Sequence, residues 1–362
     1  MLPKSRLLVL FPLLLLSLTI YACAGSATPE PTATPTVTAT ETATAIPESA
    51  PEWQPEILWR RGHDGEAVRS VAFTPNGERL AVGLFPTVEF YEVNSGDLIR
   101  SAEFRHAVES LDFSPDGAIL GAGQGVYGAV LCDAADGSEI QQLHGGYDNV
   151  VAFSPDGETV ATGNRTGTAW LWNIEDGELV AEFELPEADY IVDLAFSPDG
   201  STLAVSYFDG ALVLWDVSRQ TIIHELNFSS DQGGRVESIA FSPDGETLVA
   251  SGIRDENFKH VSRLWNVPAG TSDGVLTGYE NTVTSAAFSP DGALLATGAA
   301  SGDGAVRLWQ VSDWTLLHTL EHWKEDGEPD WVTDLAFSPD GRTIAVGTWE
   351  GELYLWQVDP EL

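Results

Sequence analysis

Residues 152–174 read AFSPDGETVATGNRTGTAWLWNI, with two short apolar runs around the turn at residues 154–157 and a third run that ends in Trp172. In a Ser-Pro-Asp-Gly turn, proline fixes φ at the first turn position, aspartate bonds back to the backbone, and glycine takes the positive φ. Short apolar runs bounded by such turns are typical of β-strands. The stretch therefore predicts a series of short strands joined by tight turns.

This unit recurs along the chain. The element Phe-Ser/Thr-Pro-Asp/Asn-Gly begins at seven phenylalanines that are 40 to 49 residues apart: Phe73, Phe113, Phe153, Phe196, Phe241, Phe288 and Phe337. Repeats of this length with several strands each predict propeller blades. We therefore expect an all-β fold over residues 53–362, a seven-bladed β-propeller of four-stranded antiparallel blades.

The third strand of most repeats ends in an aromatic residue: Tyr91, Trp172, Trp215, Trp265, Trp309 and Trp356. Together with the Phe-Ser-Pro-Asp-Gly turns, this pattern resembles the WD-repeat family of β-propellers over essentially all of residues 56–362. The family's name dipeptide occurs at Trp215-Asp216, and its Gly-His dipeptide at Gly62-His63. The resemblance implies the propeller ring, with most of the family's buried Asp-His-Ser-Trp network absent.

The two ends of the repeat region predict how the ring closes. The last repeat stops after residues 354–358 without a fourth strand, whereas residues 56–60, before the first repeat, are strand-like. This extra segment is expected to supply the missing outer strand and so remove exposed edges. Trp53 and Trp59 are then expected to be packing residues.

The first 22 residues predict a signal peptide of the lipoprotein type. Lys4 and Arg6 precede an apolar stretch, residues 7–20, that is short for a membrane span. The sequence Ile20-Tyr21-Ala22-Cys23 resembles the lipobox of bacterial lipoproteins, which implies that Cys23 is lipidated and that the protein is anchored to the cell membrane outside the cytoplasm. The alternative is cleavage at the small-x-small site of residues 22–24, which gives a secreted protein.

Residues 23–52 predict a disordered tether. Eight Thr, seven Ala and five Pro account for 20 of the 29 residues from Ala24 to Glu52, and none is aromatic. Such a segment buries too little surface to offset its ordering entropy. A coil of this length reaches roughly 30 Å.

Composition excludes several classes of function. With 17 basic and 55 acidic residues the formal net charge is −38, which repels nucleic acid. Two cysteines, Cys23 and Cys132, are too few for a disulfide framework, and Cys132 is expected to be a small buried residue. Phosphate-binding loops, nucleophile elbows and His-Glu-x-x-His motifs are absent from the sequence. We therefore expect a non-enzymatic protein without a cofactor.

One segment keeps a rival hypothesis open. Residues 318–331 contain His318 and His322 among several carboxylates, and this spacing suits a metal only on a helix, whereas the segment is expected to be an outer strand and a loop. We expect no metal there. The alternative is an extracytoplasmic enzyme, or a sensor of a ligand or metal, that uses the central channel. Asn164 and Asn227 begin glycosylation sequons.

The predicted binding surface lies on one face of the propeller. Turns after the second strand and connections to the next blade share that face, and extra residues gather there at 228–235, 253–260 and 321–331. Variable loops on a rigid scaffold are common binding sites, and exposed aromatic residues beside arginine resemble a protein-binding hot spot. The predicted partner-binding residues are Tyr190, Tyr207, Arg254, Phe258, Tyr279, Trp323, Trp331 and Trp349. We expect a monomer that presents this face to a protein partner or to a glycan.

Overall fold

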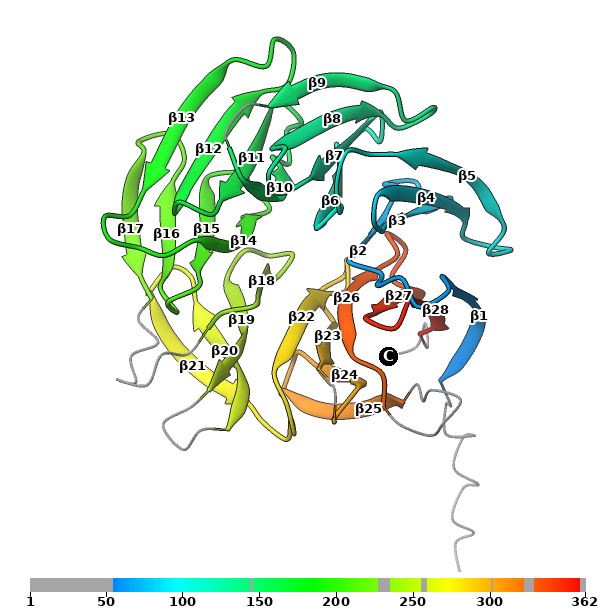
Figure 1. The fold of residues 1–362 in the computed structure, drawn as a ribbon. Helices are drawn as coiled ribbons and strands as arrows, with labels where there is room; N and C mark the ends of the chain where they lie inside the picture. The colour runs from blue at the N-terminus through cyan, green and yellow to red at the C-terminus, as the bar shows by residue number, and fades with distance from the viewer. Residues whose placement is uncertain are drawn as a thin grey trace, which may run out of the picture. The chain divides into compact units, whose positions relative to one another are not determined.

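The computed structural model describes residues 55–143, 146–226, 235–254, 259–300, 302–321 and 329–358. These ranges form 28 strands in seven four-stranded antiparallel sheets, and the sheets stand as blades around a central channel (Figure 1). The predicted seven-bladed β-propeller is therefore confirmed. The predicted signal peptide, Cys23 and the tether lie outside the described residues. Within the described ranges, no helix is long and apolar enough to cross a membrane.

The blades are numbered in chain order, and the strands of each blade are given in order from the channel to the outer edge. The strands of blades 1 to 4 are β2 (Ser70–Phe73), β3 (Arg79–Gly83), β4 (Thr87–Glu92) and β5 (Leu98–Glu103); β6 (Ser110–Phe113), β7 (Ile119–Gly123), β8 (Ala129–Asp133) and β9 (Glu139–Leu143); β10 (Asp148–Phe153), β11 (Thr159–Asn164), β12 (Thr168–Asn173) and β13 (Leu179–Glu184); and β14 (Ile191–Phe196), β15 (Thr202–Tyr207), β16 (Leu212–Asp216) and β17 (Thr221–Glu225).

Blades 5 to 7 follow the same order, except that the outer strand of blade 7 comes from the start of the propeller. Their strands are β18 (Ser238–Phe241), β19 (Thr247–Arg254), β20 (His260–Asn266) and β21 (Thr271–Leu276); β22 (Val283–Phe288), β23 (Leu294–Ala299), β24 (Ala305–Gln310) and β25 (Thr315–Glu321); and β26 (Val332–Phe337), β27 (Thr343–Thr348), β28 (Glu352–Gln357) and β1 (Glu56–Gly62).

The ring closes as the sequence predicts. Strand β1 pairs antiparallel with β28, from Glu56 opposite Gln357 to Gly62 opposite Glu352. Trp59 on β1 is 9% exposed, and its indole Nε1 donates to the carbonyl oxygen of Val93 in blade 1 at 2.7 Å. Trp59 is therefore the packing residue that was predicted, and it fastens the closing strand to the next blade.

The Ser-Pro-Asp-Gly turns lie together on one face of the ring, which we call the turn face. In blade 3, Ser154 Oγ donates to Asp156 Oδ1 at 2.6 Å, while the amides of Glu158 and Thr159 donate to Asp156 Oδ1 and Ser154 Oγ. These hydrogen bonds lower the pKa of Asp156. The repeated acidic residues are therefore turn residues, as the repetition indicates.

The same turns also pack the blades against one another. Gly157 has a φ of 71°, and a side chain there would lie 3.5 Å from the ring of Pro115 in the preceding blade. Each turn glycine meets the preceding turn's proline in this way, and Gly77 of blade 1 meets Pro339 of blade 7. The motif thus determines both the local turn and the distance between blades.

A second set of contacts joins the inner strands around the channel, and we call it the inter-blade belt. The inner strand of each blade has a free edge, whose amides find no partner within the sheet. At six of the seven blade junctions, a Ser or Asp of one inner strand accepts an amide hydrogen of the next at 2.8 to 3.2 Å: Ser70 from Leu111, Ser110 from Val151, Asp193 from Ile239, Ser238 from Ala286, Ser285 from Leu335, and Asp334 from Val71.

The junction between blades 3 and 4 differs because Val150, which has no acceptor, stands at the equivalent position. There the amide of Leu194 donates to Oδ1 of its own neighbour, Asp193, at 2.8 Å. Asp112 adds a second link between blades 2 and 3 by accepting the amide of Phe153 at 2.7 Å. Every blade except blade 3 therefore holds the next one through a Ser or Asp side chain.

Burial strongly perturbs the aspartates of this belt. Desolvation raises the pKa of Asp112 to about 6 and that of Asp193 to about 7, against the opposing effect of the amides that donate to them. The pKa of Asp334 is raised for the same reason, although Ser285 and the amide of Val71 donate to its carboxylate.

Cys132 is buried, as predicted, and burial raises its pKa to about 12. It stands where five other repeats have Trp, and it packs against blade 1. Phe90 of blade 1 replaces the leucine of blades 2 to 7, and the Arg100 guanidinium lies 3.6 Å from the centre of its ring. Phe90 and Cys132 lie in the same buried cluster between blades 1 and 2.

Replacing Asp334 by Ala should lower the free energy of unfolding by about 1–3 kcal/mol, because it leaves the amide of Val71 without its acceptor at the junction that closes the ring. Urea denaturation followed by tryptophan fluorescence measures this change. The control is Asp97→Ala, an exposed aspartate, for which a change within about 0.5 kcal/mol is expected. Equal stability of the two variants would contradict a stabilising role of the belt.

The belt also predicts a pH dependence. Since the folded pKa values of Asp112 and Asp193 are above the unfolded value, their contribution to stability is complete below pH ~4 and is lost as the pH rises through about 6 to 7. The turn aspartates have lowered pKa values, so their contribution is lost only as the pH falls below ~4.

The free energy of unfolding should therefore decrease between pH 5 and 8, and Asp193→Asn should make that decrease smaller. The turn variant Asp340→Asn is the matched control, and it should leave the slope in this range unchanged, because the pKa of Asp340 is lowered. Identical slopes for the parent and Asp193→Asn, measured at constant ionic strength, would contradict the prediction.

Candidate functional site

The structure separates the predicted partner-binding residues into three groups. Trp331 and Trp349 are 37% and 46% exposed, and Tyr190 is half-buried. Tyr207 and Tyr279 are buried, so their assignment to a binding surface is wrong. Phe258, Trp323 and the side chain of Arg254 lie outside the described part of the structure.

The two buried tyrosines belong to the core for definite reasons. Tyr207 ends strand β15, and its side chain packs into the cluster between blades 3 and 4. Tyr279 packs against Trp309, with its hydroxyl 3.0 Å from Thr297 Oγ1. Burial raises the pKa of both phenols. Their position near a loop in the sequence does not show which way their side chains point.

A pocket of about 660 Å³ opens on the face opposite the turn face, which we call the mouth face. Residues of all seven blades line this pocket, so it lies on the axis of the ring, at the mouth of the channel. Tyr190, Trp331 and Trp349 meet there, together with Arg69, Arg165 and Arg235. The structure thus brings three of the predicted residues to one site.

The first set of contacts at the mouth is the Trp331 stack, formed by Trp331, Trp349, Arg69 and Glu109. The two indoles stack with ring centres 5.3 Å apart and planes 25° apart, and the Trp349 amide donates to the Trp331 carbonyl at 2.9 Å. The Arg69 guanidinium lies 5.9 Å from the centre of the Trp349 ring and pairs with Glu109 at 2.9 Å. The glutamate therefore orients the arginine, and the arginine flanks the aromatic pair.

The second set is the Tyr190 stack, formed by Tyr190, Phe208, Arg235 and Glu237. The two rings stack at 4.3 Å and 25°, and the Phe208 amide donates to the Tyr190 carbonyl at 2.9 Å. The Arg235 guanidinium lies 4.7 Å from the centre of the Phe208 ring, and its Nε is 2.9 Å from Glu237 Oε1. As in the Trp331 stack, the glutamate pairs with the arginine, the arginine contacts one ring, and that ring stacks on the second ring.

The ring pairs of the two stacks occupy equivalent places in blades 7 and 4, whereas their arginines and glutamates come from neighbouring blades. In each, one aromatic residue precedes the inner strand, β26 or β14, and the other lies in the connection after the second strand of the blade. Three steps around a ring of seven place these blades nearly opposite each other across the channel mouth (Figure 1). The mouth therefore has an aromatic stack on either side.

Arg165 lies in blade 3, the blade before the Tyr190 stack, in the turn between β11 and β12. Its side chain is exposed, and among the described side chains no carboxylate lies within ion-pairing distance. Partial burial raises the pKa of Tyr190, while the nearby charges of Arg235 and Arg165 oppose this shift. Three arginines thus gather at one site of a chain whose net charge is −38.

Several residues of the mouth face were missed from the sequence, including Phe208 and the three arginines of the mouth. A further exposed group lies over blades 1 and 2, where Phe85 and Tyr127 are about half exposed and flank His106 at 5.6 and 5.9 Å. Both aromatic residues occupy short connections after a second strand, as Trp349 does. An aromatic residue in the connection after the second strand of a blade is the sequence signal for these exposed residues, whereas loop length indicates only blades 4 to 7.

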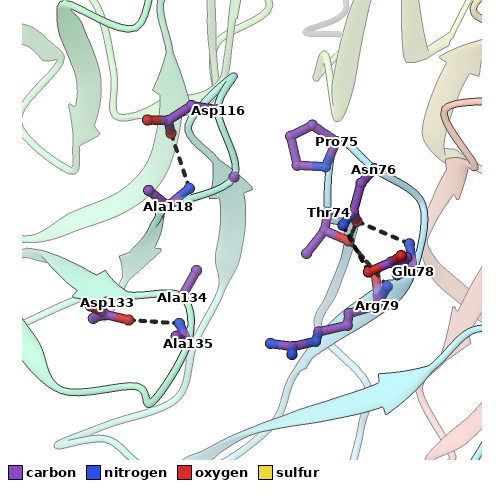
Figure 2. A pocket seen from close by; sticks show the side chains of 11 residues that line it. Thr74, Pro75, Asn76, Glu78, Arg79, Asp116, Ala118, Asp133, Ala134 and Ala135 are labelled. Atoms are coloured by element: carbon purple, nitrogen blue, oxygen red, sulfur yellow. Dashed lines mark hydrogen bonds between the residues drawn. The ribbon is translucent and has the colours of Figure 1, made fainter.

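A second pocket, of about 380 Å³, lies on the turn face between blades 1 and 2 (Figure 2). Its polar groups are engaged in the turns: Asp116 Oδ1 accepts the amide of Ala118 at 3.0 Å, and Asp133 Oδ1 accepts that of Ala135 at 2.7 Å. A pocket of the same kind lies between blades 4 and 5. We attribute both to the repeated packing of turns.

The structure bears on the metal site and the glycosylation sequons that the sequence raised. In the described ranges, no three His, Cys, Asp or Glu residues are grouped so that they could hold a metal ion, and His322 lies outside those ranges. Asn164 is 1% exposed, and its Oδ1 accepts the amides of Thr166 and Thr168 at 2.9 Å each, so it serves the turn and is inaccessible to glycosylation. Asn227 lies outside the described residues.

The fold defines a class of protein, the seven-bladed β-propellers, and in this one aromatic and arginine side chains line a pocket at one end of the channel. The repeat known as the WD domain, G-beta repeat, matches residues 56–84, 137–173, 221–259, 270–310 and 314–357, more than half of the chain. The chain belongs to the WD-repeat family, whose propellers are typically scaffolds for protein interactions. The WD40 domain of anaphase-promoting complex subunit 4 also matches, at residues 185–232.

Two kinds of eukaryotic WD protein are similar in sequence. The serine-threonine kinase receptor-associated protein of Homo sapiens is 31% identical over 127 residues, which are 34% of this chain and 36% of that protein. Periodic tryptophan protein 2 of Saccharomyces cerevisiae is 34% identical over 252 residues, which are 67% of this chain and 26% of that protein. The matched segments thus span about a third of the first relative and about a quarter of the second.

Proposed function

We propose that this protein is a non-enzymatic scaffold that binds a protein partner at the channel mouth. The observation that carries the proposal is the pair of aromatic stacks at equivalent positions of blades 4 and 7, each flanked by an arginine that pairs with a glutamate. Trp331 and Trp349 remain substantially exposed, although burial would stabilise the fold by about 1.5–3 kcal/mol per large apolar side chain. Tryptophan, tyrosine and arginine are the residues most enriched in protein-binding hot spots.

The stacks also prepare the surface for binding. Each ring stacks on a neighbouring ring, one ring of each pair also contacts an arginine, and each of these arginines pairs with a glutamate. Ordering a free side chain on association costs about 0.5–1.5 kcal/mol, and rings that are already ordered avoid much of this cost. A partner therefore meets rigid aromatic surfaces.

The proposal extends to the location of the protein. The segment Ile20-Tyr21-Ala22-Cys23 and the Thr/Pro/Ala-rich residues 24–52 support a membrane protein anchored by a lipid at Cys23, outside the cytoplasm, and a secreted protein is the alternative.

Affinity capture tests the binding function. Residues 53–362, which form a compact unit, are immobilised and exposed to an envelope extract of the source cells. We expect a protein that the parent retains and that the variant Trp331→Ala/Trp349→Ala loses, because the exposed aromatic surface is removed. The matched control is Leu98→Ala/Ile140→Ala, which removes exposed apolar side chains from outer strands and should retain the protein. Equal retention by all three would contradict the assignment of the mouth as the site.

The anchor has its own test. In cells expressing the full chain, Cys23→Ala should move the protein from the membrane fraction to the soluble fraction, because a thioether-linked lipid can no longer form. Mass spectrometry of the N-terminal peptide of the parent should show a lipidated Cys23. A parent protein that is soluble and begins after residue 22 without a lipid would favour the secreted form.

A further inference from the structure

We propose that the partner presents an extended peptide to the mouth, with one carboxylate on Arg165 and apolar side chains on Trp331 and Tyr190. This inference rests on the proposed function, because it assumes that the mouth is the binding site. It adds the chemistry of the bound segment.

The apolar part of the inference follows from the outermost rings of the two stacks. Trp349 is flanked by Trp331 and Arg69, and Phe208 by Tyr190 and Arg235. Among the described residues, no further ring or guanidinium group stacks on Trp331 or on Tyr190. These two rings therefore offer surface to a ligand on nearly opposite sides of one pocket of about 660 Å³.

The charged part follows from the ion pairs of the mouth. Glu109 and Glu237 neutralise Arg69 and Arg235 at 2.9 Å each. Arg165 keeps its charge without an ion-pair partner among the described side chains, and it projects into the same pocket lining. A guanidinium group binds a carboxylate through two parallel hydrogen bonds, which are stronger than neutral ones.

The net charge of the chain limits how acidic the partner segment is. A net charge of −38 repels a strongly acidic polymer before it reaches the mouth. A basic segment would be attracted to the acidic surface in general, but at the mouth it would meet arginine. A segment with a single carboxylate, from Asp, Glu or a chain terminus, is not strongly repelled by the acidic chain, and it can still pair with arginine at the mouth.

The same ion pairs favour a peptide over a glycan. Aromatic rings can hold either ligand, but a sugar also needs acceptors for its hydroxyl groups. The two carboxylates that line the pocket, Glu109 and Glu237, already accept from arginine. An extended peptide can place apolar side chains on both rings and a carboxylate on Arg165, while its backbone amides and carbonyls keep hydrogen bonds to water at the exposed mouth.

The experiment selects a displayed library of short peptides on residues 53–362 and measures the resynthesised peptides by fluorescence anisotropy. Enriched sequences should combine apolar residues with Asp, Glu or a free C-terminus. Arg165→Gln should weaken binding of such a peptide about tenfold. For the same peptide with its carboxylate converted to an amide, Arg165→Gln should have almost no further effect. Trp331→Ala should weaken both peptides, whereas the control Arg342→Gln, on the turn face, should weaken neither.

The outcomes separate the two proposals. Peptides that lack a carboxylate and are unaffected by Arg165→Gln, yet need Trp331, would overturn the ion pair while leaving the mouth as the site. Binding that is unaffected by both Arg165→Gln and Trp331→Ala would overturn the proposed function as well. Failure to enrich any peptide, with Trp331-dependent binding of a neutral oligosaccharide on a glycan array, would replace the peptide by a glycan.

Discussion

The free edge of each inner strand is the constraint on which the structure depends. Seven strands present unpaired amides toward one channel, and a buried amide without an acceptor costs about 1–3 kcal/mol. At six of the seven junctions the propeller meets this requirement by taking the acceptor from the preceding blade, and at ring closure Asp334 of blade 7 accepts from the amide of Val71 of blade 1. That bond forms only if the ring is closed, which the pairing of β1 with β28 ensures. The hydrogen bond between the inner strands of blades 7 and 1 therefore depends on closure of the ring.

The belt and the turn face hold the blades together, and the exposed aromatic residues of the mouth face are not part of the core clusters. Its aromatic residues lie in connections rather than in the core, and they are ordered by each other and by arginines. A repeat fold allows the same arrangement to be placed twice, at equivalent positions of two blades. The result is a pair of matched surfaces on one pocket, which a single loop would not provide.

The fold could be predicted from the sequence because its determinants are local. The Phe-Ser-Pro-Asp-Gly turn contains its own hydrogen bonds, and its spacing indicates the number of blades. The site could be predicted only in part. Trp331 and Trp349 are exposed, but Tyr207 points into the core because of its register in β15, which a loop position does not reveal. Arg69 was missed because it belongs to the blade after its aromatic partner, far away in the sequence.

The charges of the mouth complete the physical account of this face. An exposed arginine beside a tryptophan normally has many rotamers, and its ordering on binding opposes association. Glu109 and Glu237 remove both that freedom and the excess positive charge, so Arg69 and Arg235 support the rings rather than attract anions. In a chain of net charge −38, this leaves Arg165 as the lining arginine without an ion-pair partner among the described side chains, and therefore as the proposed contact for a carboxylate. In the proposed complex, the two stacks supply apolar contact surface and Arg165 supplies the charged contact.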